Sequence, residues 1–365
     1  MQPSLQNINI RNKRVLIAPL DWGLGHATRC VPIIKEFTAQ GFDVIIAGEK
    51  SGAVLLEKEF PHLKILKLKG YRVSYSKNKH FFFVKLLSQL TKIQAAVRHE
   101  HKWLQRIIEH YKIDILVSDN RYGFHNKKCY NIFITHQLSI KTGNRFTQWL
   151  AQKINYGYIN KFNECWVPDV EGNENLAGQL SHPLTMPIIP IKYIGLLSRF
   201  TKSVTEKKYN LVVILSGPEP QRTILEEIIL KQLKKITLNT FVVRGLPSAI
   251  NKIYSENKLV EIINHLPANK LNDLISSSNI VVARSGYSTV MDLAVLQQPS
   301  ILIPTPGQTE QEYLATYLAA KKYCITAEQK NFDLIQEIQK LSKTVLQKFP
   351  TSETIVLKTI INELK

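Results

Sequence analysis

Near its N-terminus the chain has a short apolar run, a glycine-containing loop, an amphipathic stretch and a second apolar run. Residues 14–19 predict a buried strand, residues 27–40 an amphipathic helix and residues 42–47 the next strand. Gly41 stands where the helix is expected to end. A strand, helix and strand in this order form a βαβ unit, whose strands are parallel and whose crossover is right-handed. The sequence therefore predicts an α/β fold.

The same alternation continues along the whole chain. Further strands are predicted at 63–68, 113–118, 131–135, 165–167, 210–216, 239–244, 259–263, 280–283 and 300–304. Helices are predicted at 82–111, 145–162, 221–234, 270–277, 288–296 and 310–321, and the tail 333–365 is expected to hold two helices separated near Pro350. A chain of 365 residues with 44% hydrophobic residues exceeds one ordinary domain. We therefore expect two packed α/β domains.

A polar stretch without an apolar period separates the two halves. Residues 198–209 predict a linker between a domain at 1–197 and a domain at 210–345. Residues 346–365 are expected to form a C-terminal helix that packs back on the first domain. Ligands of doubly wound sheets bind beyond the carboxyl ends of the strands. The functional residues are therefore expected in loops that face a cleft between the domains.

The charge of the chain is strongly positive, and its cysteines are scattered. The 48 basic and 29 acidic residues give a net charge of +19, which suggests nucleic acid, anionic lipid or a phosphorylated substrate as partner. Solvated lysines of a generally basic proteome are the alternative. The four cysteines show no CxxC spacing, which argues against a disulfide scaffold or a zinc module. Without a signal peptide or a long apolar segment, a cytoplasmic location is expected.

The loop after the strand at 280–283 carries a pattern suited to an anion. Arg284, Ser285 and Gly286 form a turn, and Ser288 stands where the N-cap of the following helix is expected. The free N–H groups and the dipole of a helix N-terminus favour phosphate. Asp292 follows one turn into the helix and could accept hydrogen bonds from ribose hydroxyls. An ordinary βα turn explains the same spacing equally well.

The first domain carries a Gly-x-Gly-His loop directly after its first strand. Gly23 and Gly25 are a weak dinucleotide signal because Thr28 replaces the third glycine of GxGxxG, so a NAD-dependent oxidoreductase is disfavoured. His26 stands at a helix N-terminus, where it could accept a proton from an attacking hydroxyl near neutral pH. The alternative is a histidine with only a structural role.

Other polar residues also follow predicted strands. Asp119 ends the strand at 113–118 and is a second candidate base, and His136 follows the strand at 131–135. Both residue types also cap strands and helices for structural reasons. The loop after the strand at 210–216 contains two prolines, which lack amide N–H groups that could bind an anion. Arg222 could supply positive charge in their place, or it could brace the loop.

Residues 280–313 resemble the donor-binding signature of glycosyltransferase family 28. The family pattern is an apolar strand, Arg-Ser-Gly or a variant, a Thr, and an acidic residue six positions after the Gly. Here Thr289 matches the Thr, and Asp292 stands where the family commonly has Glu. Gln311 and Glu312 occupy the place of the family's sugar-binding residues, where paired Gln is frequent. The exchange of one Gln for Glu leaves the hexose open.

The resemblance also assigns roles in other loops. It places a diphosphate contact at Ser216 and Gly217, to which Arg222 could add positive charge, a base-edge contact at His265, and an acceptor or phosphate loop at Gly23, Gly25, Arg29 and His136. His26 would lie beside the donor phosphates and the acceptor, and either His26 or Asp119 would be the base.

The resemblance implies a GT-B fold, in which two Rossmann-like, doubly wound domains face each other across a cleft. The first domain would bind the acceptor and the second the nucleotide-sugar. The family includes enzymes that act on lipid-linked muramyl-pentapeptide and galactolipid synthases. It therefore implies inverting, metal-independent transfer of a hexose, N-acetylglucosamine or a related sugar, from a UDP-sugar to a lipid-linked or other envelope glycan acceptor. No cofactor besides the donor substrate is expected, and Arg284 would help to stabilise the departing diphosphate.

Two alternatives and one further surface remain open at this point. A nucleotide-sugar hydrolase of related fold would use water in place of the acceptor, and free sugar released without acceptor would identify it. A basic nucleic-acid-binding protein would show strongly salt-dependent binding, but the sequence lacks a recognition motif for it. The run 79–87 holds three consecutive Phe among lysines. It predicts either a core helix or a peripheral contact with anionic lipid on the inner face of the membrane.

Overall fold

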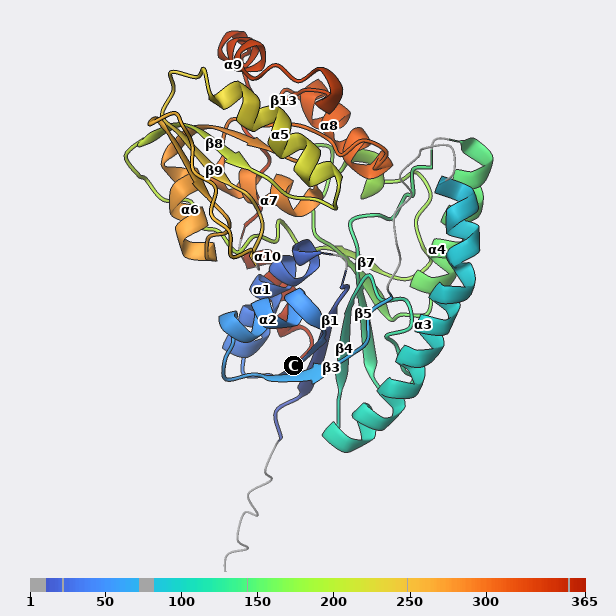
Figure 1. The fold of residues 1–365 in the computed structure, drawn as a ribbon. Helices are drawn as coiled ribbons and strands as arrows, with labels where there is room; N and C mark the ends of the chain where they lie inside the picture. The colour runs from blue at the N-terminus through green and yellow to red at the C-terminus, as the bar shows by residue number, and fades with distance from the viewer. Residues whose placement is uncertain (1–10, 22, 72–81, 143, 248, 354) are drawn as a thin grey trace, which may run out of the picture.

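The computed structural model describes residues 11–21, 23–71, 82–142, 144–247, 249–353 and 355–365, with only the backbone of 82–93. Two parallel β-sheets, each covered by helices, form two lobes stacked one above the other (Figure 1). Every strand pair in both sheets is parallel. The predicted α/β fold with two doubly wound sheets is therefore confirmed.

The first sheet has the strand order β3-β2-β1-β4-β5-β6-β7. Its strands are β1 (Arg14–Pro19), β2 (Asp43–Gly48), β3 (Lys64–Lys67), β4 (Ile115–Asp119), β5 (Tyr130–Ile134), β6 (Glu164–Val167) and β7 (Ile191–Tyr193). Its helices are α1 (Leu24–Ala39), α2 (Lys50–Glu59), α3 (Phe82–Tyr111) and α4 (Arg145–Ile159), with a 3-10 turn at Gly178–Leu180. The strand order reverses between β1 and β4, so the loops after these two strands open at the same point of the sheet edge.

The second sheet has the order β10-β9-β8-β11-β12-β13. Its strands are β8 (Tyr209–Ile214), β9 (Thr240–Val243), β10 (Val260–Ile263), β11 (Ser278–Ala283), β12 (Ser300–Leu302) and β13 (Ile325–Thr326). The helices are α5 (Gln221–Leu233), α6 (Ala268–Ser276), α7 (Tyr287–Leu296), α8 (Thr309–Ala320), α9 (Leu334–Lys343) and α10 (Ile355–Asn362). Here the order reverses between β8 and β11, which places the loops at 215–220 and 284–286 together.

Three elements were not predicted from the sequence. Helix α2 buries only Leu56 fully, so its apolar pattern is weak. Strand β7 has three residues, all partly exposed, and β13 has two. Such short edge strands lack an apolar run and form because a neighbouring strand offers free backbone groups.

The core continues from one domain into the other. The largest cluster of buried apolar side chains includes Val15 and Trp166 from the first domain and Tyr287 and Leu314 from the second. The ring of Phe37 stacks on Trp166 with centroids 6.1 Å apart. An apolar interface of this kind holds the facing loops of the two domains in register.

The chain passes between the domains twice, and the two crossings touch. The first crossing follows β7, and the second runs from α9, which packs on the second domain, to α10, which packs on the first. Leu196 N donates to Ser352 Oγ at 2.8 Å, which joins the two crossings. Helix α10 lies against α1, where Gln40 Nε2 donates to the carbonyl of Lys358 at 2.8 Å.

Two sequence expectations concern membranes. No helix in the part of the chain that the structure describes is long and apolar enough to cross a bilayer. In the run 79–87, residues 79–81 lie outside the described residues and the side chains of 82–87 are not described. Its interpretation as core or as membrane patch therefore stays a prediction.

Candidate active site

The N-termini of α1 and α7, one from each domain, meet at the junction of the two lobes (Figure 1). Ser288 Oγ donates to the carbonyl oxygen of Gly25 at 3.1 Å. A Cβ at Gly25 would lie only 2.9 Å from that hydroxyl, so the contact requires glycine. The N-cap residues are Gly23 and Gly286, which supply no capping side chain. Two positive helix ends therefore face one region, an arrangement that favours the binding of an anion.

The predicted N-cap role of Ser288 is wrong. The N-cap of α7 is Gly286, and Ser288 lies in the first turn with its hydroxyl directed at the first domain. Thr289 follows it and is partly exposed. The hydroxyl of Ser288 thus links the two domains instead of closing its own helix.

His26 and Asp119 lie together although they are far apart in sequence. His26 Nδ1 is 3.1 Å from Asp119 Oδ2, and the His26 side chain is 16% exposed while that of Asp119 is fully buried. Arg29 holds the same carboxylate with two nitrogens, Nε at 2.8 Å from Oδ2 and Nη2 on Oδ1. Burial opposes the charge of Asp119, but Arg29 and His26 outweigh it and hold the pKa of Asp119 well below its usual range.

The histidine itself has a lowered pKa. Burial is the largest cause and the charge of Arg29 the second, while the charge and hydrogen bond of Asp119 act in the opposite direction. A lowered pKa keeps the imidazole of His26 neutral near pH 7, which is the form that can accept a proton.

A second histidine connects this cluster to the other domain. His136 Nδ1 lies 3.2 Å from Arg29 Nη1, and His136 Nε2 lies 2.7 Å from Glu310 Oε1 at the start of α8. The His136 ring stacks on Tyr287 with centroids 4.1 Å apart and an interplanar angle of 7°. Burial would raise the pKa of Glu310, but the charge and hydrogen bond of His136, with smaller contributions from Arg29, lower it. His136 and Glu310 thus extend the cluster of His26, Asp119 and Arg29 into one chain of five polar residues across the domain boundary.

Sequence reasoning did not find Glu310 or Tyr287. Glu310 directly precedes the Gln311-Glu312 pair and has no distinctive pattern of its own. Its partner His136 lies 174 residues away in the sequence. Tyr287 follows the Arg-Ser-Gly turn and donates its hydroxyl to the carbonyl of Pro168 at 2.7 Å. Only a contact between domains reveals either residue.

Asp292 lies on α7 close to the linker. Ser198 Oγ donates to Asp292 Oδ1 at 2.5 Å, and the side chain is partly exposed. Burial raises the pKa of Asp292 to about 7, against the weaker opposing effects of Ser198 and Arg199. The carboxyl group expected to bind ribose therefore has a linker hydroxyl as its present partner.

The predicted contact of Arg284 with a departing diphosphate is contradicted by its placement. Its side chain is 1% exposed and serves the loops of its own domain. The guanidinium donates to four oxygens, the carbonyls of Gln221, Ile303 and Pro304 and the side-chain carbonyl of Gln329. Ser285 is also buried and donates to the carbonyl of Gln311 at 2.8 Å. Both side chains shape the donor loops from beneath.

Arg222 is likewise committed within its own domain. Its Nε donates to Glu219 at 2.5 Å and its Nη1 to Glu226 at 3.1 Å, so two carboxylates neutralise it. Of the two roles open for Arg222, these contacts favour the structural one, in which the residue braces its loop. Ser216 is half-buried, and Gly217 is exposed with φ of +103°, a conformation that favours glycine.

His265 is exposed at the loop after β10. Its pKa is lowered by burial first and then by the charges of Arg199 and Lys58. Lys58 belongs to α2 of the first domain, and Arg199 to the linker. His265 thus lies on the interdomain side of the second sheet, as a contact with a bound nucleotide requires.

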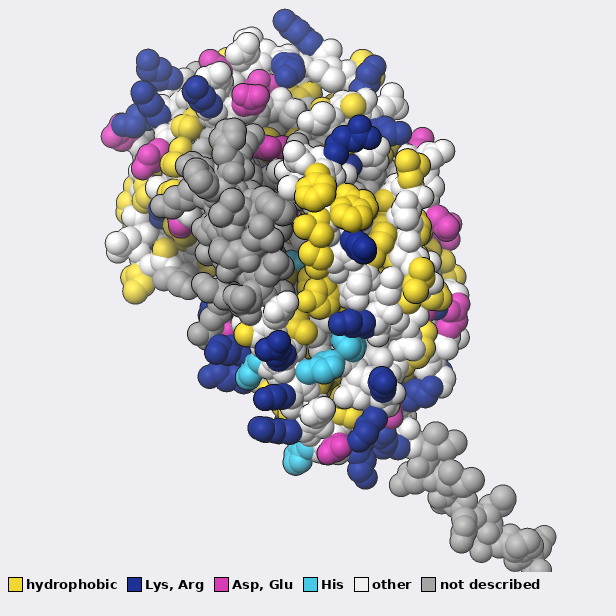
Figure 2. Space-filling view, turned by 90° about the vertical axis from the view of Figure 1, so that its right-hand side faces the viewer, with side chains coloured by type: hydrophobic (Ala, Val, Ile, Leu, Met, Phe, Trp, Pro, Cys, Tyr) yellow, Lys and Arg dark blue, Asp and Glu magenta, His cyan; other side chains and the backbone are white. Residues whose placement is uncertain are grey.

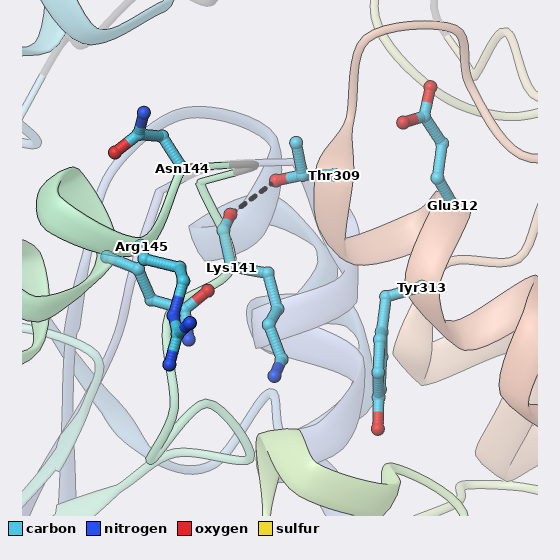
Figure 3. Close-up of a pocket in the computed structure, with 7 residues that line it drawn as sticks. Lys141, Asn144, Arg145, Thr309, Glu312 and Tyr313 are labelled. Atoms are coloured by element: carbon cyan, nitrogen blue, oxygen red, sulfur yellow. Dashed lines mark hydrogen bonds between the residues drawn. The ribbon is translucent and has the colours of Figure 1, made fainter.

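A pocket of about 380 Å³ opens between α4 and α8. It is lined by Lys141, Asn144, Arg145 and Gln148 from the first domain and Thr309, Glu312 and Tyr313 from the second. Figure 3 shows Lys141 and Arg145 on one side, facing Glu312 and Tyr313 on α8, and the hydrogen bond from Thr309 Oγ1 to the carbonyl of Lys141 at 2.8 Å. The pocket combines two cations, a carboxylate and an aromatic ring, which suits a polar ligand with negative charge.

Gln311 and Glu312 close the turn before α8. The side-chain carbonyl of Gln311 accepts from Thr305 N at 2.9 Å, and Glu312 Oε1 accepts from Gly307 N at 3.0 Å. Among the residues that the structure describes, no group of three His, Cys, Asp or Glu side chains forms a metal-binding cluster.

Comparison with known proteins agrees on the class of enzyme. The model of the glycosyltransferase family 28 C-terminal domain matches residues 211–362, and a glycosyl transferase family 1 model matches residues 14–163. The resemblance to family 28 is therefore confirmed for the second domain, and the chain is similar to glycosyltransferases in both halves.

Among curated relatives, one from Actinobacillus pleuropneumoniae serotype 5b (strain L20) is 22% identical, over 93% of this chain and 96% of its own length. Its name is UDP-N-acetylglucosamine--N-acetylmuramyl-(pentapeptide) pyrophosphoryl-undecaprenol N-acetylglucosamine transferase. An uncharacterized glycosyltransferase of Methanosarcina mazei is also 22% identical, over 85% of this chain and 84% of its own length.

Solved structures share the fold. Spinosyn rhamnosyltransferase SpnG aligns with a TM-score of 0.66 at 13% identity, over 96% of each chain. MurG of Acinetobacter baumannii aligns with a TM-score of 0.55 at 12% identity, over 96% of this chain and 94% of that one. These alignments confirm the GT-B architecture expected from the sequence.

Proposed function

We propose that this chain, a glycosyltransferase whose second domain matches family 28, transfers a hexose from a UDP-sugar to a lipid-linked acceptor of the cell envelope. The observation that supports this proposal most strongly is the position of the His26–Asp119 pair. It lies next to the contact between Gly25 and Ser288, where the N-terminus of α7 reaches the first domain. The names of the relatives support N-acetylglucosamine as the sugar. Glu312, in the place of the family's second Gln, is the residue on which the choice of hexose depends.

The proposed reaction is a direct displacement with inversion. The acceptor oxygen forms a bond to the anomeric carbon while the bond from that carbon to the diphosphate oxygen breaks. The proton of the acceptor hydroxyl passes to Nε2 of His26. Asp119 is fully buried and already holds Arg29, so it orients and polarises His26 instead of acting as the base.

The leaving diphosphate takes up negative charge as the bond breaks. We propose that the N-termini of α1 and α7 stabilise this charge, together with the loop at Ser216 and Gly217. We propose that Arg284 and Arg222 act by fixing the loops, because both terminal nitrogens of Arg284 hold loop oxygens and two carboxylates hold Arg222. We propose that the reaction needs no metal ion, since these helix ends supply the positive potential.

The acceptor is proposed to enter by the pocket between α4 and α8, where Lys141 and Arg145 would meet its phosphate groups. Figure 2 shows apolar side chains beside Lys and Arg on the face that carries α3 and α4. On α4, Phe146 is 68% and Trp149 58% exposed, and Lys153 Nζ lies 5.4 Å from the Trp149 ring centroid. Exposed aromatic rings with flanking cations favour the surface of an anionic membrane. This surface and the charge of +19 support a peripheral position on the inner face.

The test is a thermal-shift panel with UDP-, GDP- and dTDP-sugars on the wild type, on Asp292→Ala and on Asp273→Ala as a matched control on α6. UDP-sugars should raise the midpoint of the wild type and of the control, but not that of Asp292→Ala. The proposal is wrong if no nucleotide-sugar raises the thermal midpoint of the wild type. In turnover assays, release of free sugar without acceptor at the rate of transfer would identify a hydrolase instead.

A further inference from the structure

Glu310 is the second domain's charged contribution to the histidine cluster of the first domain. Its carboxylate oxygen lies 2.7 Å from His136 Nε2, and the side chain is 33% exposed. His136 is 5% exposed and lies between Arg29 on one side and Glu310 on the other, with Tyr287 stacked on its face. The orientation of His136 therefore depends on both domains.

The donors and acceptors of this chain fix the protonated nitrogen of His136. A guanidinium can only donate hydrogen bonds, so His136 Nδ1 accepts from Arg29 at 3.2 Å. In a neutral imidazole the proton then lies on Nε2, from which it is donated to the carboxylate of Glu310 at 2.7 Å. Glu310 thus selects the tautomer of His136 that can hold Arg29.

At His26 the same Arg29 competes with Asp119 for one nitrogen. His26 Nδ1 is 2.8 Å from Arg29 Nη2 and 3.1 Å from Asp119 Oδ2. If Arg29 donates to Nδ1, the proton of His26 lies on Nε2, and that nitrogen cannot accept another. If Nδ1 donates to Asp119, Nε2 is unprotonated and can act as the base. The orientation of Arg29 therefore decides what His26 can do.

We propose that Glu310 is a positioning residue for the transfer reaction: through His136 it holds Arg29, and so it sets whether Arg29 or Asp119 is the partner of His26 Nδ1. This inference rests on the proposed function of His26 as the base. Because Glu310 belongs to α8 of the second domain and His136 to the first domain, this positioning exists only while the two domains are in contact.

Three elements supply the described contacts of His136: Arg29 from α1, Tyr287 from α7 and Glu310 from α8. Behind Arg29, Asp119 at the end of β4 contacts both Arg29 and His26. Of the ion-paired residues in this chain of contacts, Glu310 has the most exposed side chain. Replacing Glu310 should therefore disturb the core least.

The experiment compares the wild type with Glu310→Leu, which removes the acceptor for His136 Nε2, and with Glu256→Leu as a matched control at an exposed carboxylate paired with Lys234. Protein labelled with ¹⁵N at histidine reports the tautomer of His26 from its two ring-nitrogen shifts, assigned with His26→Gln. Turnover is measured from pH 5.5 to 9. In Glu310→Leu we expect the tautomer of His26 to change, seen as an exchange of the shifts of its two ring nitrogens. We also expect kcat to fall about tenfold or more while KM for the donor changes less than about threefold.

A second variant separates positioning from packing. In His136→Gln the amide can still accept from Arg29 and donate to Glu310, so the wild-type tautomer of His26 should be retained, whereas His136→Leu should lose it. The inference is overturned if Glu310→Leu keeps the wild-type tautomer of His26, whatever its kcat. The tautomer measurement needs no substrate, so it remains decisive even if nucleotide-sugars fail to bind and the proposed function falls.

Discussion

Replacing Asp292 by Asn should stabilise the donor-free protein while weakening the binding of a nucleotide-sugar. Burial raises the pKa of this carboxyl from 3.8 to about 7. Between these two values the folded protein binds more protons at Asp292 than the unfolded chain does. The free energy of unfolding therefore falls as pH rises from about 4 to about 7, and the loss is complete above pH 7.

The size of the effect follows from the shift. About three pKa units correspond to about 4 kcal/mol as an upper limit. Because Asp292 is partly exposed and accepts a hydrogen bond from Ser198, water and the hydroxyl offset part of the cost, and we expect about 2 kcal/mol. Asn keeps the shape and the acceptor for Ser198 without the charge.

The assay is urea denaturation of the wild type, Asp292→Asn and the exposed control Asp273→Asn at intervals from pH 4 to pH 8. The advantage of Asp292→Asn over the wild type should grow from near zero at pH 4 to its full value at pH 7 and then stay constant. UDP-sugar should raise the stability of the wild type at pH 8 and hardly affect the variant. A variant that is equally or less stable than the wild type at pH 8 refutes the reasoning, because the buried charge would then cost nothing.

Three further predictions concern the base, the donor loops and the membrane face. His26→Gln should lower kcat about a hundredfold or more with little change in donor binding. An unchanged kcat of His26→Gln at saturating donor would show that His26 is not the base. Asp119→Asn should lower kcat and also lower the free energy of unfolding by about 3 kcal/mol, because it leaves the buried guanidinium of Arg29 without its charged partner. Arg284→Leu should cost about 3 kcal/mol in urea denaturation because four oxygen acceptors lose their donor, and a loss confined to donor affinity would contradict that structural role. Replacing both Phe146 and Trp149 by Ser should weaken sedimentation with anionic vesicles by about tenfold or more; binding that persists would place the contact on another surface.

Much of the fold could be predicted because its strands are buried on both faces. Strand β1 and helix α3 begin and end at the residues that the apolar pattern predicts. The rule that ligands lie beyond the carboxyl ends of parallel strands also brought His26 and Asp119 into one region correctly. Strands β7 and β13 escaped prediction because two or three partly exposed residues carry no periodicity.

The direction of charged side chains could not be predicted. Arg284 matches the family pattern and follows a strand, yet its guanidinium turns into its own domain, because unpaired carbonyl groups of neighbouring loops need a donor there. Glu310 shows the opposite case, a residue without a distinctive sequence signal that gains a role from a partner 174 residues away. Contacts between domains depend on how the two units dock, which local pattern does not encode.

The two chain crossings joined by Leu196 and Ser352 also set how the lobes can move. Because both crossings pass side by side, we expect them to act as a hinge about which the second lobe rotates. A protease that cuts only the linker would leave the lobes attached through the segment before α10. Access for a bulky acceptor would then come from a swing that opens the far side of the cleft, with the helix ends nearest the hinge moving least.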